Sequence, residues 1–229
     1  AKEARRFFGT PMYFWNSGIG LIMLLAAGVA ALVMQNDLRE LVAMMGGALP
    51  VMPMAALVMG FCLCTCLIAA PSISLEGRYL WILREAPVDE KSLLWVKTGF
   101  ELLLSVPCTV IAGVCLTIAL QLSAADAAVL LGAMLLFCVG HAAFGMLMGL
   151  TFPKLDAVNE TVVVKQGMAS MLDMFVPMAV LGVCALLYWL GGMLAEWAAL
   201  ALPVVLVLVL TAACVVILAR RGPEMLKAL

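Results

Sequence analysis

Charged side chains are scarce in this chain. Of its 229 residues, 12% are Asp, Glu, Lys or Arg and 66% are hydrophobic, and the formal net charge is −1. A soluble domain has about 25% charged and about 45–50% apolar residues. The chain therefore has too little polar surface to face water, and a bilayer must be most of its solvent. No run of basic residues is long enough to indicate a nucleic-acid partner.

Signatures of catalysis, nucleotide binding and metal binding are missing too. The sequence has no G-x-x-x-x-G-K-[ST] phosphate loop, no H-E-x-x-H pair and no G-x-S-x-G turn. Its single histidine, His141, excludes any site that needs two. Cys62, Cys64 and Cys66 are spaced by two, which puts neighbours on different helix faces, so packing is favoured over metal binding. We expect no catalytic residue, metal or cofactor in this chain; if ATP drives it, the ATPase is another chain.

Long apolar runs are what the sequence has instead, and they predict an all-α polytopic membrane protein. A membrane-spanning helix needs about 20 mostly apolar residues. All but one of the 13 Lys and Arg residues, Arg39, fall on one side of the resulting topology, so both termini, loops 71–97 and 151–170 and a tail at 220–229 are expected in the cytosol. Six runs within a transmembrane domain at 17–219 qualify: 17–34, 50–70, 98–120, 127–150, 171–190 and 198–219.

The N-terminal segment, residues 1–16, is too charged to insert. Its basic residues are followed by aromatic rings, a pattern typical of a helix that lies among the lipid headgroups. The alternative is an ordinary positively charged flank with an aromatic belt. We expect the interfacial helix.

Three ionisable residues fall within or beside the apolar runs. Glu101 and Asp173 are expected in the first turns of helices that start at the cytosolic face, where water and the helix dipole favour a solvated carboxylate over a buried relay. His141 lies deeper, next to the small-xxx-small pair of Gly145 and Gly149. We interpret it as a neutral imidazole that bonds across a close helix contact, without a carboxylate partner. The alternative is a pathway residue of an intramembrane enzyme, channel or secondary transporter.

The long loop at residues 74–92 reads as a short amphipathic helix. Apolar residues fall on one side of it, Pro87 ends it, and Asp89 can cap a new helix that enters the third span. Periodicity favours equally a plain interfacial helix and a docking surface for a cytosolic partner.

Two loops carry a resemblance to a known family. Residues 70–97, with the order Pro71, Glu76-Gly77, Trp81 and Pro87, are similar to a loop in a bacterial group of permease subunits of type-2 ATP-binding cassette transporters. The sequence resembles the C-terminal half of these proteins. The second loop matches the group at Phe152, Pro153, Lys154, Asp156, Asn159, Glu160, Lys165 and Gln166.

The resemblance implies a six-helix permease subunit in the bacterial cytoplasmic membrane. Its coupling helix would dock on a separate nucleotide-binding ATPase subunit that holds ATP-Mg, and a second six-helix half, as a homodimer or a fused partner, would complete a path that exports an amphiphile, lipid or peptide. The residues expected to couple to the ATPase are Glu76, Gly77, Arg78, Trp81, Leu83, Arg84 and Pro87.

Overall fold

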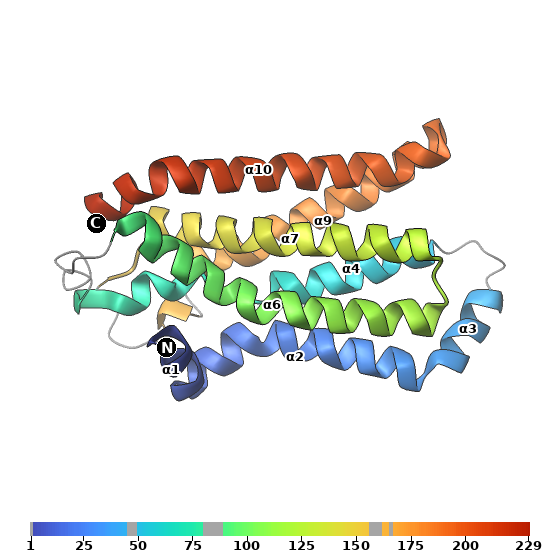
Figure 1. Cartoon of the computed structure of the whole chain (residues 1–229), viewed down its shortest axis with the longest axis horizontal. Helices are drawn as coiled ribbons and strands as arrows, with labels where there is room; N and C mark the ends of the chain where they lie inside the picture. The colour runs from blue at the N-terminus through green and yellow to red at the C-terminus, as the bar shows by residue number, and fades with distance from the viewer. Residues whose placement is uncertain (1, 45–49, 80–88, 156–161, 165–166) are drawn as a thin grey trace.

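The described part of the chain consists mostly of apolar helices. The computed structural model describes residues 2–44, 50–79, 89–155, 162–164 and 167–229, and no strand occurs among them (Figure 1). Within this part, five helices are long and apolar enough to cross a membrane. These regions correspond to α2 (Pro11–Val33), α6 (Glu90–Leu120), α7 (Ala124–Thr151), α9 (Met168–Leu194) and α10 (Glu196–Ala228).

The predicted count of six spanning helices is not confirmed. The second apolar run, 50–70, is helical only over the 14 residues of α4 (Val51–Cys64). At a rise of about 1.5 Å per residue, such a helix is roughly 21 Å long, shorter than the roughly 30 Å of hydrocarbon in a bilayer. The shorter elements beside it are α1 (Lys2–Gly9), α3 (Gln35–Met44) and the 3₁₀ helices η1 (Ala70–Ser72) and η2 (Ser74–Tyr79).

Side-chain caps define the ends of several helices. Asp89 caps α6, as predicted, by accepting the Ser92 N–H at 3.1 Å, and Ser123 caps α7 in the same way. A single residue, Ala195, separates α9 from α10. The N-terminal segment divides at Thr10 into α1 and the start of α2, and the expected tail at 220–229 continues α10 almost to its end.

The long helices lie side by side. In Figure 1, α6 lies between α2 and α7, while α10 packs along α7 and α9. Both chain ends lie at the same end of the bundle, at the left of the view. Outward-facing side chains such as Leu103, Val209 and Ile217 are exposed and apolar, as lipid-facing side chains are. The chain thus has the surface of a membrane protein.

Candidate functional site

The chain loses helical geometry in the middle of an apolar run. After Cys64 it follows an irregular course over residues 65–69 before η1 and η2; we call residues 65–79 the broken segment. Every side chain from Cys66 to Ile73 is buried. At membrane depth, non-helical backbone is tolerated only where protein covers it or where it lines a cavity, and such breaks hold the binding sites of many membrane proteins.

Side chains from two neighbouring helices satisfy the backbone of the broken segment. The Tyr13 hydroxyl of α2 donates to the Ile68 carbonyl at 2.8 Å. The Ala69 N–H donates to Oε2 of Glu101 on α6 at 2.7 Å. The broken segment is therefore held by polar groups at this end of the bundle.

Glu101 also belongs to a set of buried ionisable side chains that we call the charge cluster: Glu101 on α6, His141 on α7 and Asp173 on α9. His141 Nδ1 lies 2.9 Å from Glu101 Oε1, and its Nε2 lies 3.8 Å from Asp173 Oδ1. None of the three residues is more than 4% exposed. His141 Nε2 and both carboxylate oxygens of Asp173 have no hydrogen-bond partner among the described residues. The three residues connect three helices to the broken segment.

This arrangement overturns the expectation for these residues. Glu101 is not in a first turn, because α6 begins at Glu90, well before the predicted start of that span. Asp173 is near the start of α9 but is completely buried rather than solvated. His141 therefore does have carboxylate neighbours, on both sides of its ring.

Pro177 adds a further acceptor to the cluster. Proline has no N–H, so the Asp173 carbonyl, four residues earlier in α9, loses its helical donor. The carboxylate of the same residue lies 3.8 Å from His141 Nε2. Asp173 thus carries both a carboxylate and a backbone oxygen that lacks its helical donor.

The glycines of α7 make close contacts within the chain. A Cβ added at Gly145 would lie 2.7 Å from Asp173 Oδ2, so this glycine leaves room for the carboxylate. Gly149 faces the backbone of Ala70 in the broken segment. The predicted small-residue contact beside His141 is therefore an internal one, to α9 and to the broken segment.

A second set of charges, the α1 network, closes the same end of the bundle. Glu76 of η2 binds Lys2 and Arg6 of α1 and Lys97 of α6, with the nearest N–O distances between 2.8 and 3.0 Å, and Lys97 also binds Glu3 at 2.7 Å. Burial alone would raise the pKa of the Glu76 carboxyl, but Lys97, Lys2 and Arg6 outweigh this effect and lower the pKa to about 2. Glu76, expected on a docking face, is only 3% exposed and is paired within the chain.

The other loop residues singled out by the sequence are only partly described. Gly77 has a positive φ of 54°, and Arg78 follows it in η2. The backbone N–H of Lys154 donates to the Ser74 hydroxyl at 2.9 Å, which joins the second loop, near Pro153, to the broken segment. The remaining predicted loop residues lie outside the described residues: Trp81, Leu83, Arg84, Pro87, Asp156, Asn159, Glu160 and Lys165.

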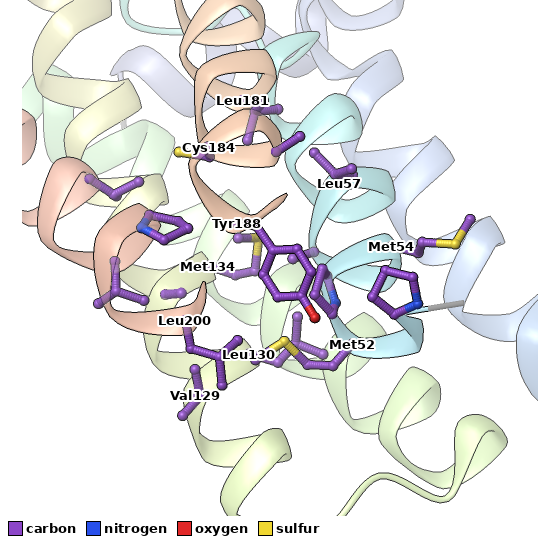
Figure 2. A pocket seen from close by; sticks show the side chains of 18 of the residues that line it. Met52, Met54, Leu57, Val129, Leu130, Met134, Leu181, Cys184, Tyr188 and Leu200 are labelled. Atoms are coloured by element: carbon purple, nitrogen blue, oxygen red, sulfur yellow. The ribbon is translucent and has the colours of Figure 1, made fainter. Parts of the chain in front are cut away.

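The opposite end of the bundle holds an apolar cavity of about 300 Å³ between α4, α7, α9 and α10. Figure 2 shows Tyr188 among methionine and leucine side chains of its wall. Tyr188 carries the one side-chain oxygen among the lining residues. No group of three or more His, Cys, Asp or Glu side chains in the described ranges is arranged to hold a metal.

Comparison with known families corrects the reading of the two loops. A family model described as "Putative ATP-binding cassette" matches residues 19–218. No curated protein and no solved structure matches the chain. The matched family is not a permease family, so the interpretation as the C-terminal half of a permease subunit is wrong, and so is the exporter function drawn from it. That interpretation depended on two short loops, most of whose matching residues lie outside the described part of the chain.

Proposed function

Because this chain belongs to the ATP-binding cassette family whose model covers residues 19–218, we propose that it is a membrane-embedded component of an ATP-binding cassette system, and that its charge cluster changes state by gaining and losing a proton. The sequence has no phosphate loop, so ATP is not assigned a site in this chain. The proposal concerns the charge cluster, which lies among the membrane-spanning helices.

One observation carries the proposal. Hydrogen-bond distances link the Ala69 N–H to Glu101 and Glu101 to His141, and the other ring nitrogen of His141 lies 3.8 Å from Asp173, so the set extends across three helices and the broken segment. Buried ionisable groups with specific charged neighbours are candidates for functional sites. Within a membrane such groups are costly, and they often mark proton or ion pathways.

The charge cluster has a net negative charge when both of its carboxyl groups are ionised. Two carboxylates face one imidazole, so the formal charge is −2 with a neutral ring and −1 with an imidazolium. Burying an uncompensated charge costs several kcal/mol, on the order of the stability of a small domain. A proton gained from outside reduces this cost, and the cluster therefore has a physical reason to bind one.

The proton also has a structural consequence. When His141 Nδ1 donates to Glu101, a further proton on Nε2 gives the ring a second donor, directed at Asp173 across the present 3.8 Å gap. Closing that gap draws α9 toward α7. Losing the proton releases α9, and Glu101 carries the change to residue 69 of the broken segment.

Few other titratable groups act on the cluster. Tyr13 of α2, Cys66 of the broken segment and Cys138 of α7 lie within electrostatic range of Glu101. Cys64 of α4 and Cys66 lie within electrostatic range of Asp173. Phenol and thiol groups ordinarily keep their protons at neutral pH. The proton is therefore assigned to the three members of the cluster.

We also assign the remaining crossing of the membrane to α4 together with residues 65–70 of the broken segment. α4 begins at the end of the bundle opposite the termini, and the broken segment continues toward the end that holds them (Figure 1). The even number of crossings expected from the basic residues would then be kept. Accessibility of single cysteines placed at Asn36 and Ser92 to an impermeant thiol reagent tests this topology. The proposed crossing lies between these two positions, so they are expected on opposite sides of the membrane.

Nuclear magnetic resonance of the single histidine tests the protonation directly. The purified chain with ¹⁵N-labelled histidine has one imidazole, so its two nitrogen signals belong to His141 without assignment work. We expect both signals to move with pH while the protein stays folded, and Asp173→Asn to change the midpoint of that movement. Signals that stay constant over the whole folded range would refute the proposal.

Hydrogen exchange tests the link to the broken segment. Glu101→Gln should speed amide exchange over residues 66–73, because the carboxylate no longer accepts from Ala69 with a full charge. Glu196→Gln, at an exposed carboxylate in the first turn of α10, is the matched control and should leave this exchange unchanged. Equal exchange in both variants would separate the cluster from the broken segment.

A further inference from the structure

A second cavity, of about 170 Å³, lies beside the charge cluster between α7, α9 and α10. Phe137 and Phe144 of α7 and Pro177 of α9 form part of its apolar wall, and His141 brings its imidazole to the same wall. The Thr211 hydroxyl, also in the wall, donates to the Leu136 carbonyl at 3.3 Å. The cavity thus combines an apolar body with an ionisable end.

The ionisable end lacks a donor. His141 Nε2 and both Asp173 carboxylate oxygens are buried without a hydrogen-bond partner among the described residues. The Asp173 carbonyl lacks its helical donor because residue 177 is proline, which adds a further acceptor oxygen on the same residue. When Nδ1 carries the ring proton toward Glu101, Nε2 is an acceptor as well. Asp173 is not itself a wall residue of the cavity; its Oδ1 lies 3.8 Å from His141 Nε2, so the unpaired acceptors lie directly behind the His141 part of the wall.

We propose that this cavity binds a small amphiphilic amine, with its apolar body between Phe137 and Phe144 and its ammonium group at the His141 part of the wall, behind which the carboxylates of Glu101 and Asp173 lie. An ammonium group has several N–H donors and no acceptor, which is the complement of this set of groups. Its positive charge also offsets the excess of carboxylate charge. A neutral alcohol of the same shape supplies one donor and no charge.

The size of the cavity limits the ligand. An apolar cavity of about 150 Å³ holds one benzene molecule. Benzylammonium, a benzene ring with one aminomethyl group, is therefore a suitable probe, and its ring can pack edge-on against the two phenylalanines. The inference uses the proposed function in one respect: the amine and the proton are alternative ways to offset the same negative charge.

The test compares benzylamine with benzyl alcohol on the purified full chain, with the ¹⁵N signals of His141 as the readout. We expect benzylamine to bind roughly tenfold more tightly or better, because hydrogen bonds to charged groups are about twice as strong as neutral ones. Asp173→Asn should reduce the preference to about twofold or less. Asp37→Asn, at an exposed aspartate of α3, removes the same charge elsewhere and should keep the full preference.

A second variant keeps the test decisive if Asp173→Asn does not fold. Val180→Phe fills the cavity from α9 without touching a charge, so it should abolish binding of both probes while His141 still responds to pH. Equal affinity for the two probes, a preference that survives Asp173→Asn, or binding that survives Val180→Phe would overturn the inference. If His141 responds to pH but shows no amine preference, only this inference fails; if it binds the amine but ignores pH, only the proposed function fails.

Discussion

The two ends of the helical bundle have different interiors. At the end that holds both termini, Glu76, Lys97, Glu101, His141 and Asp173 are buried together with several hydroxyl side chains. At the other end, the cavity of Figure 2 is walled by aliphatic, aromatic and methionine side chains, with one tyrosine hydroxyl. The same apolar helices, α7 and α9, run through both ends.

The difference indicates which end of the bundle determines how the helices are arranged. Apolar interiors tolerate changes that keep the volume and pattern, because dispersion and burial have little directional preference. A buried polar network tolerates few changes, because each unpaired group loses its solvation without compensation. We therefore expect the charge cluster to determine the arrangement of the helices, and the cavity end to accept substitution.

The largest expected effect is at the polar end of α7. Gly145→Leu would place a side chain against the Asp173 carboxylate, and we expect a loss at or above the upper end of the about 1–3 kcal/mol typical of overpacking. Gly132→Leu, on the same helix with nothing within 4 Å of an added Cβ, should change stability by about 0.5 kcal/mol or less. Thermal unfolding of the purified variants measures both. Similar losses in the two variants would remove the contrast between the ends.

The two tyrosine hydroxyls offer a smaller and more closely matched comparison. Tyr13→Phe removes the donor to the Ile68 carbonyl and leaves a buried acceptor unpaired, which costs about 1–3 kcal/mol. Tyr188→Phe, in the wall of the apolar cavity, removes the same atom and should cost about 0.5 kcal/mol or less. The difference between their unfolding free energies is the quantity to measure. A Tyr188 variant that is as destabilised as the Tyr13 variant would contradict the apolar description of that end.

The α1 network predicts a pH dependence confined to the polar end. The pKa of Glu76 is lowered from 4.5 to about 2 in the folded protein, so its ionised form stabilises the fold above about pH 4.5 and this stabilisation is lost as the pH falls toward 2. Thermal unfolding should show the wild type as more stable than Glu76→Gln at pH 7, with the difference shrinking below about pH 4.5. A difference that stays constant down to pH 2 would mean that charge pairing is not what holds α1.

The smallest effect is expected at the apolar cavity. Ala185→Leu adds volume where space exists and should change the unfolding free energy by about 0.5 kcal/mol or less, or raise it slightly. Ala142→Leu, at a completely buried position next to His141, should lose about 1–3 kcal/mol. Chemical unfolding in one detergent can compare the pair. If Ala185→Leu is the more damaging change, the cavity is less tolerant than its wall suggests.

The sequence was sufficient for the class of fold and for five of the long helices. Composition alone indicates a membrane protein, and Asp89 gave the start of α6 correctly. The break after α4 could not be predicted, because residues 65–70 are as apolar as a helix and contain neither glycine nor proline. The break is stabilised by Tyr13 and Glu101, which come from distant parts of the chain, and hydropathy does not report such contacts.

The charge cluster could have been found in part from the sequence. Glu101 lies 19 residues before Leu120, the last residue of α6, and His141 lies 17 residues after Ala124, the first residue of α7. In an antiparallel pair of helices, such similar distances from the turn put the two side chains at about the same depth. The signal was missed because the depth of Glu101 was counted from residue 98, where the apolar run begins, and not from Asp89, the predicted cap of the helix. The position of Asp173 beside His141 depends on how α9 packs against α7. In the sequence of α7, Gly145 is the residue that leaves room for the Asp173 carboxylate.

The contacts of the α1 network also have a consequence for the order in which the molecule is assembled. Lys2 and Glu76 are separated by 74 residues, and Glu3 and Lys97 by 94. At about 5–20 residues per second, roughly 5 to 20 s pass on the ribosome between the synthesis of α1 and that of its last ionic partner. Until Glu76 and Lys97 have been made, Lys2, Glu3 and Arg6 of α1 have only water, lipid headgroups or each other to bind. The α1 network can form only after the first turns of α6 have been made. The docking of α1, the first helix to be synthesised, is therefore a late step in assembly.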